Sequence, residues 1–344
     1  MGREMAAASV PRTMKTLVTG GAGFIGSHVS RELLNAGHSV VVLDDLSGGR
    51  SGNIPPAAMF VQASVTDHAL VESLFVEHGF DYVFHIAAYA AEGLSHHIRR
   101  FNYNNNVIGS VNLINAAVNT DVKCFVFTSS IAVYGSGEMP FNEKDHAIPE
   151  DPYGVAKLAV EQDLRIAQRT FGLRYVILRP HNVYGERQNI VDRYRNVVGI
   201  FMRQVLRGEP MAIFGDGEQT RAFSYIGDVA PLIARAIDTP AAYNQIINLG
   251  SDQVCSINEL AEAVARVVGV EKLVVHLEAR CEVRHAQACH DRMRTIFGTE
   301  AETLLQDGLS SMAPWARSVN GRLAPHFADI EIDKNIPGSW VSQE

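Results

Sequence analysis

Tyr153 and Lys157 stand four residues apart, directly after Asp151 and Pro152, a pair typical of the first turn of a helix. At this spacing both side chains lie on one helical face, where the ammonium group favours the phenolate and lowers the tyrosine pKa from about 10 toward neutrality. A phenolate can take a proton from a substrate hydroxyl. An ordinary surface pair has the same spacing, so the interpretation depends on the elements beside the helix.

A second pair of polar residues, Ser129 and Ser130, ends the apolar segment KCFVFTSS at 123–130. The segment is predicted to be a strand, and open α/β sheets bind their ligands at the carboxyl ends of such strands. A serine hydroxyl at that edge can hydrogen-bond a substrate oxygen beside the tyrosine. Serine, tyrosine and lysine together predict proton transfer at one edge of a sheet.

Glycines dominate the segment GGAGFIGS at 20–27, which follows a strand candidate and opens a helix candidate. Gly20, Gly23 and Gly26 allow a tight turn whose backbone N–H groups can approach a pyrophosphate. Asp44 ends the next strand candidate, where a ribose-binding acid belongs. Its carboxylate favours NAD over NADP, because it would repel a 2′-phosphate. A glycine turn without a ligand is the alternative.

Short β-branched segments alternate with longer helical ones in the first half of the chain. The strand candidates are 15–20, 39–44, 59–63, 81–87, 123–130 and 174–180, and the helix candidates lie near 24–36, 67–78, 101–119 and 152–171. The strands are apolar throughout, which indicates burial on both faces, and the helices are long enough for right-handed crossovers. The pattern predicts an α/β fold with a doubly wound parallel Rossmann sheet.

The regular alternation fades after Pro180. We expect residues 15–180 to form an NAD-binding Rossmann domain, to which a segment at about 226–250 returns. Residues 181–344 are expected to form mainly a smaller α/β substrate-binding lobe, and residues 1–14 a disordered leader without a signal-peptide pattern. The cleft between the two lobes is the default ligand site.

Composition narrows the class of protein. The chain has 344 residues, 47% of them hydrophobic and 20% charged, with a net charge of -8, which excludes a disordered chain and a disulfide-stabilised miniprotein. Thirty basic against 38 acidic residues give no general affinity for nucleic acid. No apolar segment reaches the roughly 18 residues of a membrane span. We therefore expect a cytoplasmic protein with neither nucleic-acid nor membrane partners.

The four cysteines include no CxxC pair, so reduced thiols are expected. Cys281, His285, Cys289 and His290 stand close enough in the sequence to suggest a metal site. The cysteine spacing of about two to four residues that is typical of structural zinc is missing, however. We therefore predict no metal.

Seven motifs resemble, in order and spacing, the extended short-chain dehydrogenase/reductases, and among them the NAD-dependent nucleotide-sugar epimerase/dehydratase family, closest to UDP-glucose 4-epimerase-like enzymes. The motifs are GGAGFIGS (20–27), HIAA (85–88), NNV (105–107), SSIAVYG (129–135), YGVAK (153–157), RPHNVYG (179–185) and GDGEQTRAFSYIGDVA (215–230). The resemblance covers about residues 15–298. It implies NAD as the cofactor and a nucleotide sugar, a UDP-hexose, as the substrate.

The resemblance implies three catalytic residues: Ser130 as partner of the substrate hydroxyl, Tyr153 as the base, and Lys157 as its ribose-bound helper. It also implies a set of cofactor contacts, in which Ser64 replaces an acid that is usual in the family at the adenine. That set is Gly20, Gly23, Phe24, Ile25, Gly26, Asp44, Asp45, Ser64, Val65, Ala87, Ala88, Asn106, Tyr153, Lys157, Pro180 and His181. A solvated turn acid is the alternative for Asp45, and a packed histidine is the alternative for His181.

Substrate contacts are implied in the same way. They are Ser130, Tyr153, Asn182, Arg221, Arg280 and Glu282. Arg221 and Arg280 would hold the diphosphate, since a guanidinium can bind phosphate through two parallel hydrogen bonds. Glu282 would contact the uridine ribose. The alternatives are a turn cap for Asn182 and a solvent-exposed ion pair for Arg280.

The two residues after Ser130 separate the reactions that occur in the family. A 4,6-dehydratase carries an Asp-Glu pair there and a UDP-glucuronate decarboxylase usually keeps the Glu, whereas this chain has Ile131 and Ala132, which cannot transfer a proton. We therefore expect 4-epimerisation of a UDP-hexose through a transient 4-keto sugar, an isomerase reaction. The alternatives are a decarboxylase, a dehydratase or reductase, and, less favoured, a non-catalytic NAD-sensing protein.

Two helix candidates carry apolar residues at helical spacing: Val107, Val111, Ile114, Leu158 and Ile166. The resemblance implies that these helices pair across a two-fold axis as a four-helix bundle in a homodimer. The alternative is that these residues only face the sheet.

Overall fold

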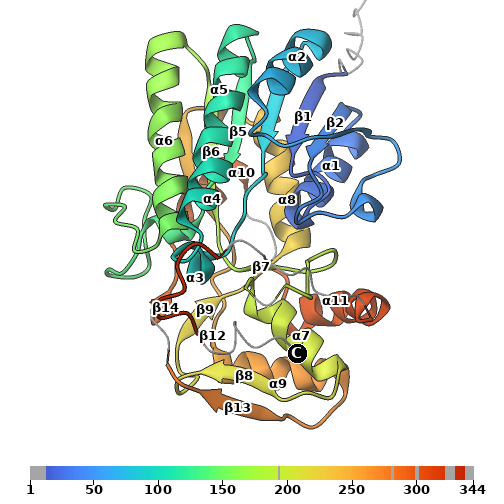
Figure 1. Cartoon of the computed structure of the whole chain (residues 1–344), viewed down its shortest axis with the longest axis vertical. Helices are drawn as coiled ribbons and strands as arrows, with labels where there is room; N and C mark the ends of the chain where they lie inside the picture. The colour runs from blue at the N-terminus through green and yellow to red at the C-terminus, as the bar shows by residue number, and fades with distance from the viewer. Residues whose placement is uncertain (1–12, 193, 280–282, 299–301, 322–329, 338–344) are drawn as a thin grey trace, which may run out of the picture.

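Seven parallel strands form the main sheet of the computed structural model, which describes residues 13–192, 194–279, 283–298, 302–321 and 330–337 (Figure 1). The strands are β1 (Lys15–Thr19), β2 (Ser39–Asp44), β3 (Met59–Gln62), β4 (Tyr82–His85), β5 (Cys124–Thr128), β6 (Tyr175–Pro180) and β11 (Gln245–Leu249). Their order is β11-β6-β5-β4-β1-β2-β3. Because the order reverses between β1 and β4, a ligand crevice is expected at the carboxyl ends of these two strands.

Helices cover both faces of the main sheet (Figure 1). They are α1 (Phe24–Asn35), α2 (His68–His78), α5 (Gly109–Asn119), α6 (Pro152–Phe171), α8 (Ile226–Arg235) and α10 (Asp291–Phe297), while the short α4 (Arg99–Tyr103) packs against α6. Side chains of α2, α5 and α6 share one core cluster, and those of α1, α8 and α10 share another. Leu17 and Val18, adjacent on β1, belong to different clusters because side chains alternate across a sheet. Two buried faces thus explain the continuous apolar strands.

The smaller lobe consists of short strands and helices around a separate core. Its strands are β7 (Val183–Tyr184), β8 (Met211–Phe214), β9 (Thr220–Ala222), β10 (Ser224–Tyr225), β12 (Val254–Ser256), β13 (Val274–Leu277) and β14 (His285–Ala286), and its helices are α7 (Val197–Leu206), α9 (Ile257–Val268) and α11 (Leu305–Val319). Ser256 and Glu259 form a capping box at the start of α9. α11, from the tail that the sequence motifs leave unassigned, packs its apolar face into this core.

The predicted strands and helices of the first half are confirmed, with ends that differ by at most two residues except in one helix. The helix expected at 101–119 is divided into α4 and α5 by a π-helical turn at Asn104–Ile108. Such turns are frequent at functional sites.

One element lies in a different lobe from the one expected. α10 was predicted as part of the smaller lobe, but it packs on the main sheet, because Met293 and Phe297 are buried four residues apart beside Ile247 of β11. In the described part of the chain, no helix has both the length and the apolar character needed to cross a bilayer.

Candidate active site

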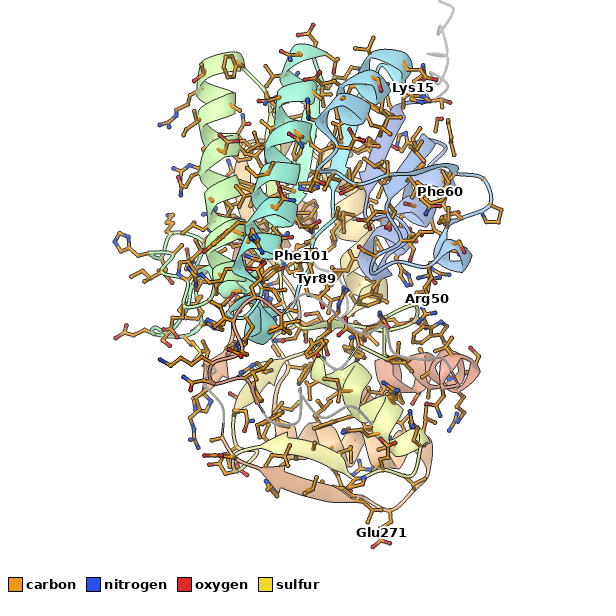
Figure 2. The ribbon with its side chains drawn as sticks, viewed as in Figure 1. Lys15, Arg50, Phe60, Tyr89, Phe101 and Glu271 are labelled. Atoms are coloured by element: carbon orange, nitrogen blue, oxygen red, sulfur yellow. The ribbon has the colours of Figure 1, made fainter. Side chains whose placement is uncertain are left out.

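A cavity of about 490 Å³ opens between the main sheet and the smaller lobe. The ends of β1, β2, β5 and β6 supply one side of its wall, and residues such as Phe214 and Arg221 supply the other. Tyr89 and Phe101, which also line it, are labelled at the junction of the lobes in Figure 2. The cavity therefore occupies the cleft that the sequence predicts, beside the reversal of strand order.

The glycine-rich turn after β1 leads directly into the cavity wall. Gly20 has a left-handed φ of +70°, and a Cβ there would come within 2.7 Å of the Ala87 Cα, so a larger residue does not fit. Gly23 caps α1 without any side-chain hydrogen bond, and Phe24 and Ile25 of the first turn line the cavity. The α1 N-terminus therefore presents backbone N–H groups to this end of the cavity.

Asp44 ends β2 at the same end of the cavity. One carboxylate oxygen accepts a hydrogen bond from the Ala22 N–H at 3.0 Å and the other from the Leu46 N–H at 2.8 Å, while burial raises the pKa of the carboxyl. Asp45 also lines the cavity but is exposed, and its side chain accepts hydrogen bonds from the backbone and hydroxyl of Ser47. Asp44 is thus the rigidly held acid of the two.

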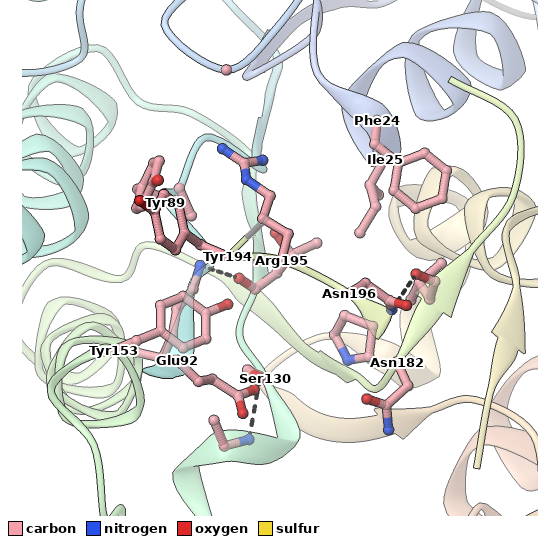
Figure 3. Close-up of a pocket in the computed structure, with 18 of the residues that line it drawn as sticks. Phe24, Ile25, Tyr89, Glu92, Ser130, Tyr153, Asn182, Tyr194, Arg195 and Asn196 are labelled. Carbon is pink, nitrogen blue, oxygen red and sulfur yellow. Dashed lines mark hydrogen bonds between the residues drawn. The ribbon is translucent and has the colours of Figure 1, made fainter. Parts of the chain in front are cut away.

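Ser130 and Tyr153 meet at the opposite end of the cavity. Ser130 precedes a 3-10 turn at Ile131–Val133, and its Oγ accepts a hydrogen bond from the Ala132 N–H at 3.1 Å (Figure 3). Tyr153 is the second residue of α6, whose start is fixed by Asp151 accepting a hydrogen bond from the Gly154 N–H at 2.9 Å. The side chains of Ser130 and Tyr153 both line this end of the cavity, and Ser130 acts to lower the pKa of the Tyr153 phenol.

The electrostatic environment of Tyr153 differs from the one expected. Burial raises the pKa of its phenol well above the ordinary value, the charge of Glu92 raises it further, and the Ser130 hydrogen bond and Arg195 lower it. The Lys157 ammonium lies 5.7 Å from the tyrosine ring centroid, and burial is the largest influence on the pKa of the phenol. Without a ligand, Tyr153 therefore keeps its proton.

Lys157 is anchored behind Tyr153. Its Nζ donates a hydrogen bond to the Thr128 carbonyl at 2.7 Å, and burial lowers its pKa to about 7, against the opposing charge of Glu161. Glu161 is itself buried, forms two hydrogen bonds with Arg179 at 2.9 and 2.6 Å, and accepts one from the Ser129 hydroxyl. Of the two serines, Ser130 is therefore the one whose hydroxyl faces the tyrosine.

On the substrate side the predicted residues are held by the backbone of the smaller lobe. Asn182 has a left-handed φ of +43° and donates a hydrogen bond to the Ala222 carbonyl at 3.2 Å. The Arg221 guanidinium donates to the carbonyls of Thr220, Val283 and Arg284 at 2.5 to 2.9 Å, which fixes it at the edge of the cavity.

Most of the predicted site residues line this one cavity. They are Gly20, Gly23, Phe24, Ile25, Gly26, Asp44, Asp45, Val65, Ala87, Ala88, Ser130, Tyr153, Lys157, Pro180, Asn182 and Arg221. Arg280 and Glu282, predicted for the substrate, lie outside the described residues, as does Cys281 of the cluster weighed as a metal site. Among the described residues, no three side chains of the types that bind metals are grouped together.

Three predicted cofactor contacts lie behind the wall instead of in it. The Ser64 hydroxyl is 2.8 Å from that of Thr66, and Asn106 holds the backbone of Tyr89 through hydrogen bonds at 3.0 and 3.3 Å. His181 is 1% exposed, and its Nε2 lies 2.8 Å from Nε2 of His290. Each of these side chains is occupied by a neighbouring protein group.

The polar residues of the wall that the sequence reasoning missed include Glu92, Tyr194, Arg195 and Asn196 (Figure 3). The Arg195 guanidinium lies over the Tyr89 ring at 5.0 Å and forms an ion pair with Asp192 at 2.8 Å. Glu92 follows the carboxyl end of a predicted strand within a few residues, which is a usable signal. The loop at 194–196 carries no comparable signal, because it adjoins no strand of the main sheet.

The wall fits a dinucleotide. The uncapped start of α1 supplies backbone donors for a pyrophosphate, and Asp44 supplies an acceptor for a ribose hydroxyl. Lys157 and Pro180 line the other end of the same cavity, beside Ser130 and Tyr153. A doubly wound sheet with this glycine turn and this serine, tyrosine and lysine defines an enzyme of the short-chain dehydrogenase/reductase type.

The chain belongs to the NAD-dependent epimerase/dehydratase family, whose profile matches residues 16–250, and NAD is its cofactor. It is 35% identical over 313 residues to a UDP-glucose 4-epimerase of Mycolicibacterium smegmatis, which covers 89% of this chain and 99% of that one. It is 32% identical over 276 residues to a UDP-N-acetyl-alpha-D-glucosaminuronate decarboxylase of Bacillus cytotoxicus, covering 76% and 83%.

Two solved structures are similar over the same extent. The UDP-glucose 4-epimerase of Thermotoga maritima with UDP-glucose has a TM-score of 0.85 and 34% identity, covering 89% of this chain and 99% of that one. The UDP-glucose 4-epimerase of Thermus thermophilus in complex with NAD has a TM-score of 0.84 and 32% identity, covering 89% and 99%. The two solved structures share the fold, one of them holds NAD, and the relatives include both epimerases and a decarboxylase.

Proposed function

We propose that the chain catalyses the 4-epimerisation of a UDP-hexose through a transient 4-keto sugar. The observation that carries the proposal is the pair Ile131 and Ala132, which follows Ser130 and lines the cavity beside Tyr153. Neither side chain can donate or accept a proton, so neither can assist the loss of a C6 hydroxyl or of a carboxylate. An epimerase needs no proton transfer at C5 or C6.

Proton transfer at O4 is assigned to the residues that meet in the cavity. Tyr153 accepts the O4 proton and later returns it, and the Ser130 hydroxyl donates a hydrogen bond to O4. Lys157, held by the Thr128 carbonyl, supplies positive charge near the phenolate. NAD, when bound, supplies the oxidising and reducing equivalents for the sugar carbon.

Lys157 also explains how the base is activated. Because burial keeps Tyr153 protonated in the bare protein, the phenolate needs nearby positive charge. Glu161 favours the charged form of Lys157 through its own carboxylate. Glu161, a buried acid that does not line the cavity, therefore favours the positive charge of Lys157 beside Tyr153.

Glu92 is the residue that a dehydratase or decarboxylase mechanism would have to recruit. It lines the cavity, and its charge acts on Tyr153 (Figure 3). It lies on another element, at the start of α3 (Glu92–Ser95), and not at the two positions after Ser130 where the family resemblance leads us to expect the acids of such a mechanism. The reaction products separate the two mechanisms.

The test is to incubate the NAD-loaded protein with UDP-glucose, UDP-galactose and their N-acetyl and uronic acid forms, and to identify the products by NMR. An epimerase gives a C4 stereoisomer of unchanged mass. With substrate deuterated at C4 the label returns to C4, and little deuterium enters C5 from D2O. A 4-keto-6-deoxy sugar, a pentose or rapid C5 exchange would contradict the proposal. The Tyr153→Phe variant is the control for contaminating activity.

We also propose a homodimer formed through α5 and α6. Ile166 on α6 is 48% exposed, and Ile108 and Val155 at the starts of these helices are 49% and 40% exposed. Ile114, which the sequence places on the same face, is instead buried in the main core. The exposed residues thus support the interface, with Ile114 outside it.

A further inference from the structure

Residues 330–332, which we call the strap, lie against the turn at 97–101. The N–H groups of Glu331 and Ile332 both donate hydrogen bonds to the His97 carbonyl, at 2.8 and 3.2 Å. The Ile332 carbonyl lies 2.7 Å from Nδ1 of His97. Ile330 packs against a small apolar cluster that includes Ile98. The tail of the chain is thus fastened to a segment more than 200 residues earlier.

The side chain of Glu331 makes the most specific contact of the strap. Its two oxygens accept hydrogen bonds from the N–H groups of Arg100 and Phe101, each at 2.8 Å. Ile98, the residue at the N-cap of α4, makes no side-chain cap of its own. Burial opposes the charged form of Glu331, but these two hydrogen bonds prevail and lower its pKa. A distant carboxylate therefore fixes the first turn of α4.

The first turn of α4 reaches the cavity through one aromatic contact. The Phe101 ring meets the Tyr89 ring edge to face with centroids 5.4 Å apart, and both residues line the cavity (Figure 2). Tyr89 in turn lies under the Arg195 guanidinium. Any rotation of α4 would therefore move three side chains of the wall.

A second contact joins the same helix to the catalytic tyrosine. The Asn102 side chain donates a hydrogen bond to the carbonyl of Pro152 at 2.8 Å, directly before Tyr153. Asn102 also accepts one from Asn106, which holds the Tyr89 backbone. α4 is thus held by the strap on one side and by the start of α6 on the other.

We propose that Glu331 is a positioning residue that holds Phe101 and Tyr89, through α4, in the wall contacted by the sugar of the substrate. The role of the wall rests on the proposed function. Glu331 itself does not line the cavity, so its effect is on the placement of its neighbours. No motif points to it, because its partners are backbone groups far away in the sequence.

The experiment compares Glu331→Ala with Asp333→Ala in the full-length, NAD-loaded protein. Asp333 is an exposed acid in the same segment, so its variant is matched for charge. Affinity for UDP-glucose is measured by calorimetry, turnover by NMR, and amide exchange by mass spectrometry on peptides covering 98–103. For Glu331→Ala we expect a 3- to 10-fold weaker affinity, at least 10-fold faster exchange at Arg100 and Phe101, and unchanged NAD content.

Two comparisons make the result decisive. Glu331→Gln keeps one acceptor oxygen, so its exchange and affinity should lie between those of the unaltered protein and of Glu331→Ala. If Glu331→Ala binds UDP-glucose with unchanged affinity, the positioning role is wrong, whether or not amide exchange is faster. A loss of NAD from this variant also contradicts the role, because it would indicate a general disturbance of the fold. If the unaltered protein binds UDP-glucose but does not epimerise it, the proposed function is wrong. The positioning role of Glu331 is then still tested by the affinity and the amide exchange of its variants.

Discussion

The two halves of the cavity are built in different ways. The cofactor half takes its residues from the carboxyl ends of strands in one sheet, as with Asp44 at the end of β2 and Ser130 just after β5. The substrate half takes them from short strands and loops whose pairing partners are distant, as with Arg221, which is fastened to carbonyls of residues 283 and 284. A regular sheet fixes position through its own geometry, whereas loops need individual contacts.

This difference predicts how each half responds to substitution. In the cofactor half, a single side chain can be removed without moving the backbone that carries it. We therefore expect such a substitution to change catalysis or cofactor binding and to leave the local structure unchanged. In the substrate half, a side chain such as Arg221 is also part of the scaffold, so its loss changes binding and local structure together.

The largest effect is expected for Tyr153→Phe. Removal of the phenolic oxygen should lower turnover by roughly 10²–10⁴-fold, the usual scale of general acid-base catalysis, while NAD content stays unchanged. The measurement is the initial rate on a UDP-hexose together with the absorbance of bound cofactor. A rate near that of the unaltered protein would remove Tyr153 from the mechanism.

Lys157→Met should lower turnover by a similar amount and also release NAD. The side chain fills the same buried space without the charge, so the loss reports on the ammonium group itself. The readout is NAD retained after gel filtration, measured beside Tyr153→Phe. Equal retention in both variants would contradict a contact between Lys157 and the cofactor ribose.

Arg221→Lys tests the substrate half. A lysine keeps the charge but cannot reproduce the three hydrogen bonds to carbonyls, and it offers phosphate a single point of charge. We expect KM for the UDP-sugar to rise about 10- to 100-fold, the scale of one charged hydrogen bond, with kcat changed less. A fall in kcat at unchanged KM would place Arg221 in the reaction instead.

Acid should destabilise the cofactor half through His85. This histidine is buried between the hydroxyls of Thr19 and Ser110, and burial lowers its pKa to about 3. Between pH 6.5 and 3 the unfolded chain binds a proton that the folded chain does not, so stability falls as pH falls, by up to about 1.4 kcal/mol per pH unit for this group. Urea unfolding of His85→Gln should show a shallower decline from pH 7 to 5, and the exposed His146→Gln an unchanged one.

The smallest effect on turnover is expected for Ile166→Glu. A charge on this exposed position of α6 should shift light scattering from twice 37.6 kDa toward 37.6 kDa at micromolar concentration, with activity per chain changed less than about two-fold. Val76→Glu, on the exposed side of α2, is the control and should leave the mass unchanged. A 37.6 kDa particle in the unaltered protein would contradict the dimer.

The sequence predicts the cofactor half well and the substrate half poorly, for the same physical reason. Alternating apolar strands and helices specify a doubly wound sheet, and a position just after a strand identifies Ser130 or Asp44 without knowledge of any distant contact. Arg195 becomes part of the site only because its guanidinium lies over Tyr89, more than 100 residues earlier. His181 shows the converse, since a local motif cannot distinguish a histidine packed against His290 from one that lines the cofactor site.

The place of β11 in the main sheet has a consequence for synthesis on the ribosome. The strand beside β6, β11, is translated only after the first part of the smaller lobe, from β7 to β10, and the helix that covers it, α10, is translated later still. About 69 residues separate the end of β6 at Pro180 from the end of β11 at Leu249, which at roughly 5–20 residues per second corresponds to about 3–14 s. During that interval the nascent sheet has an unpaired edge at β6, so early binding by chaperones or a second chain would concentrate there.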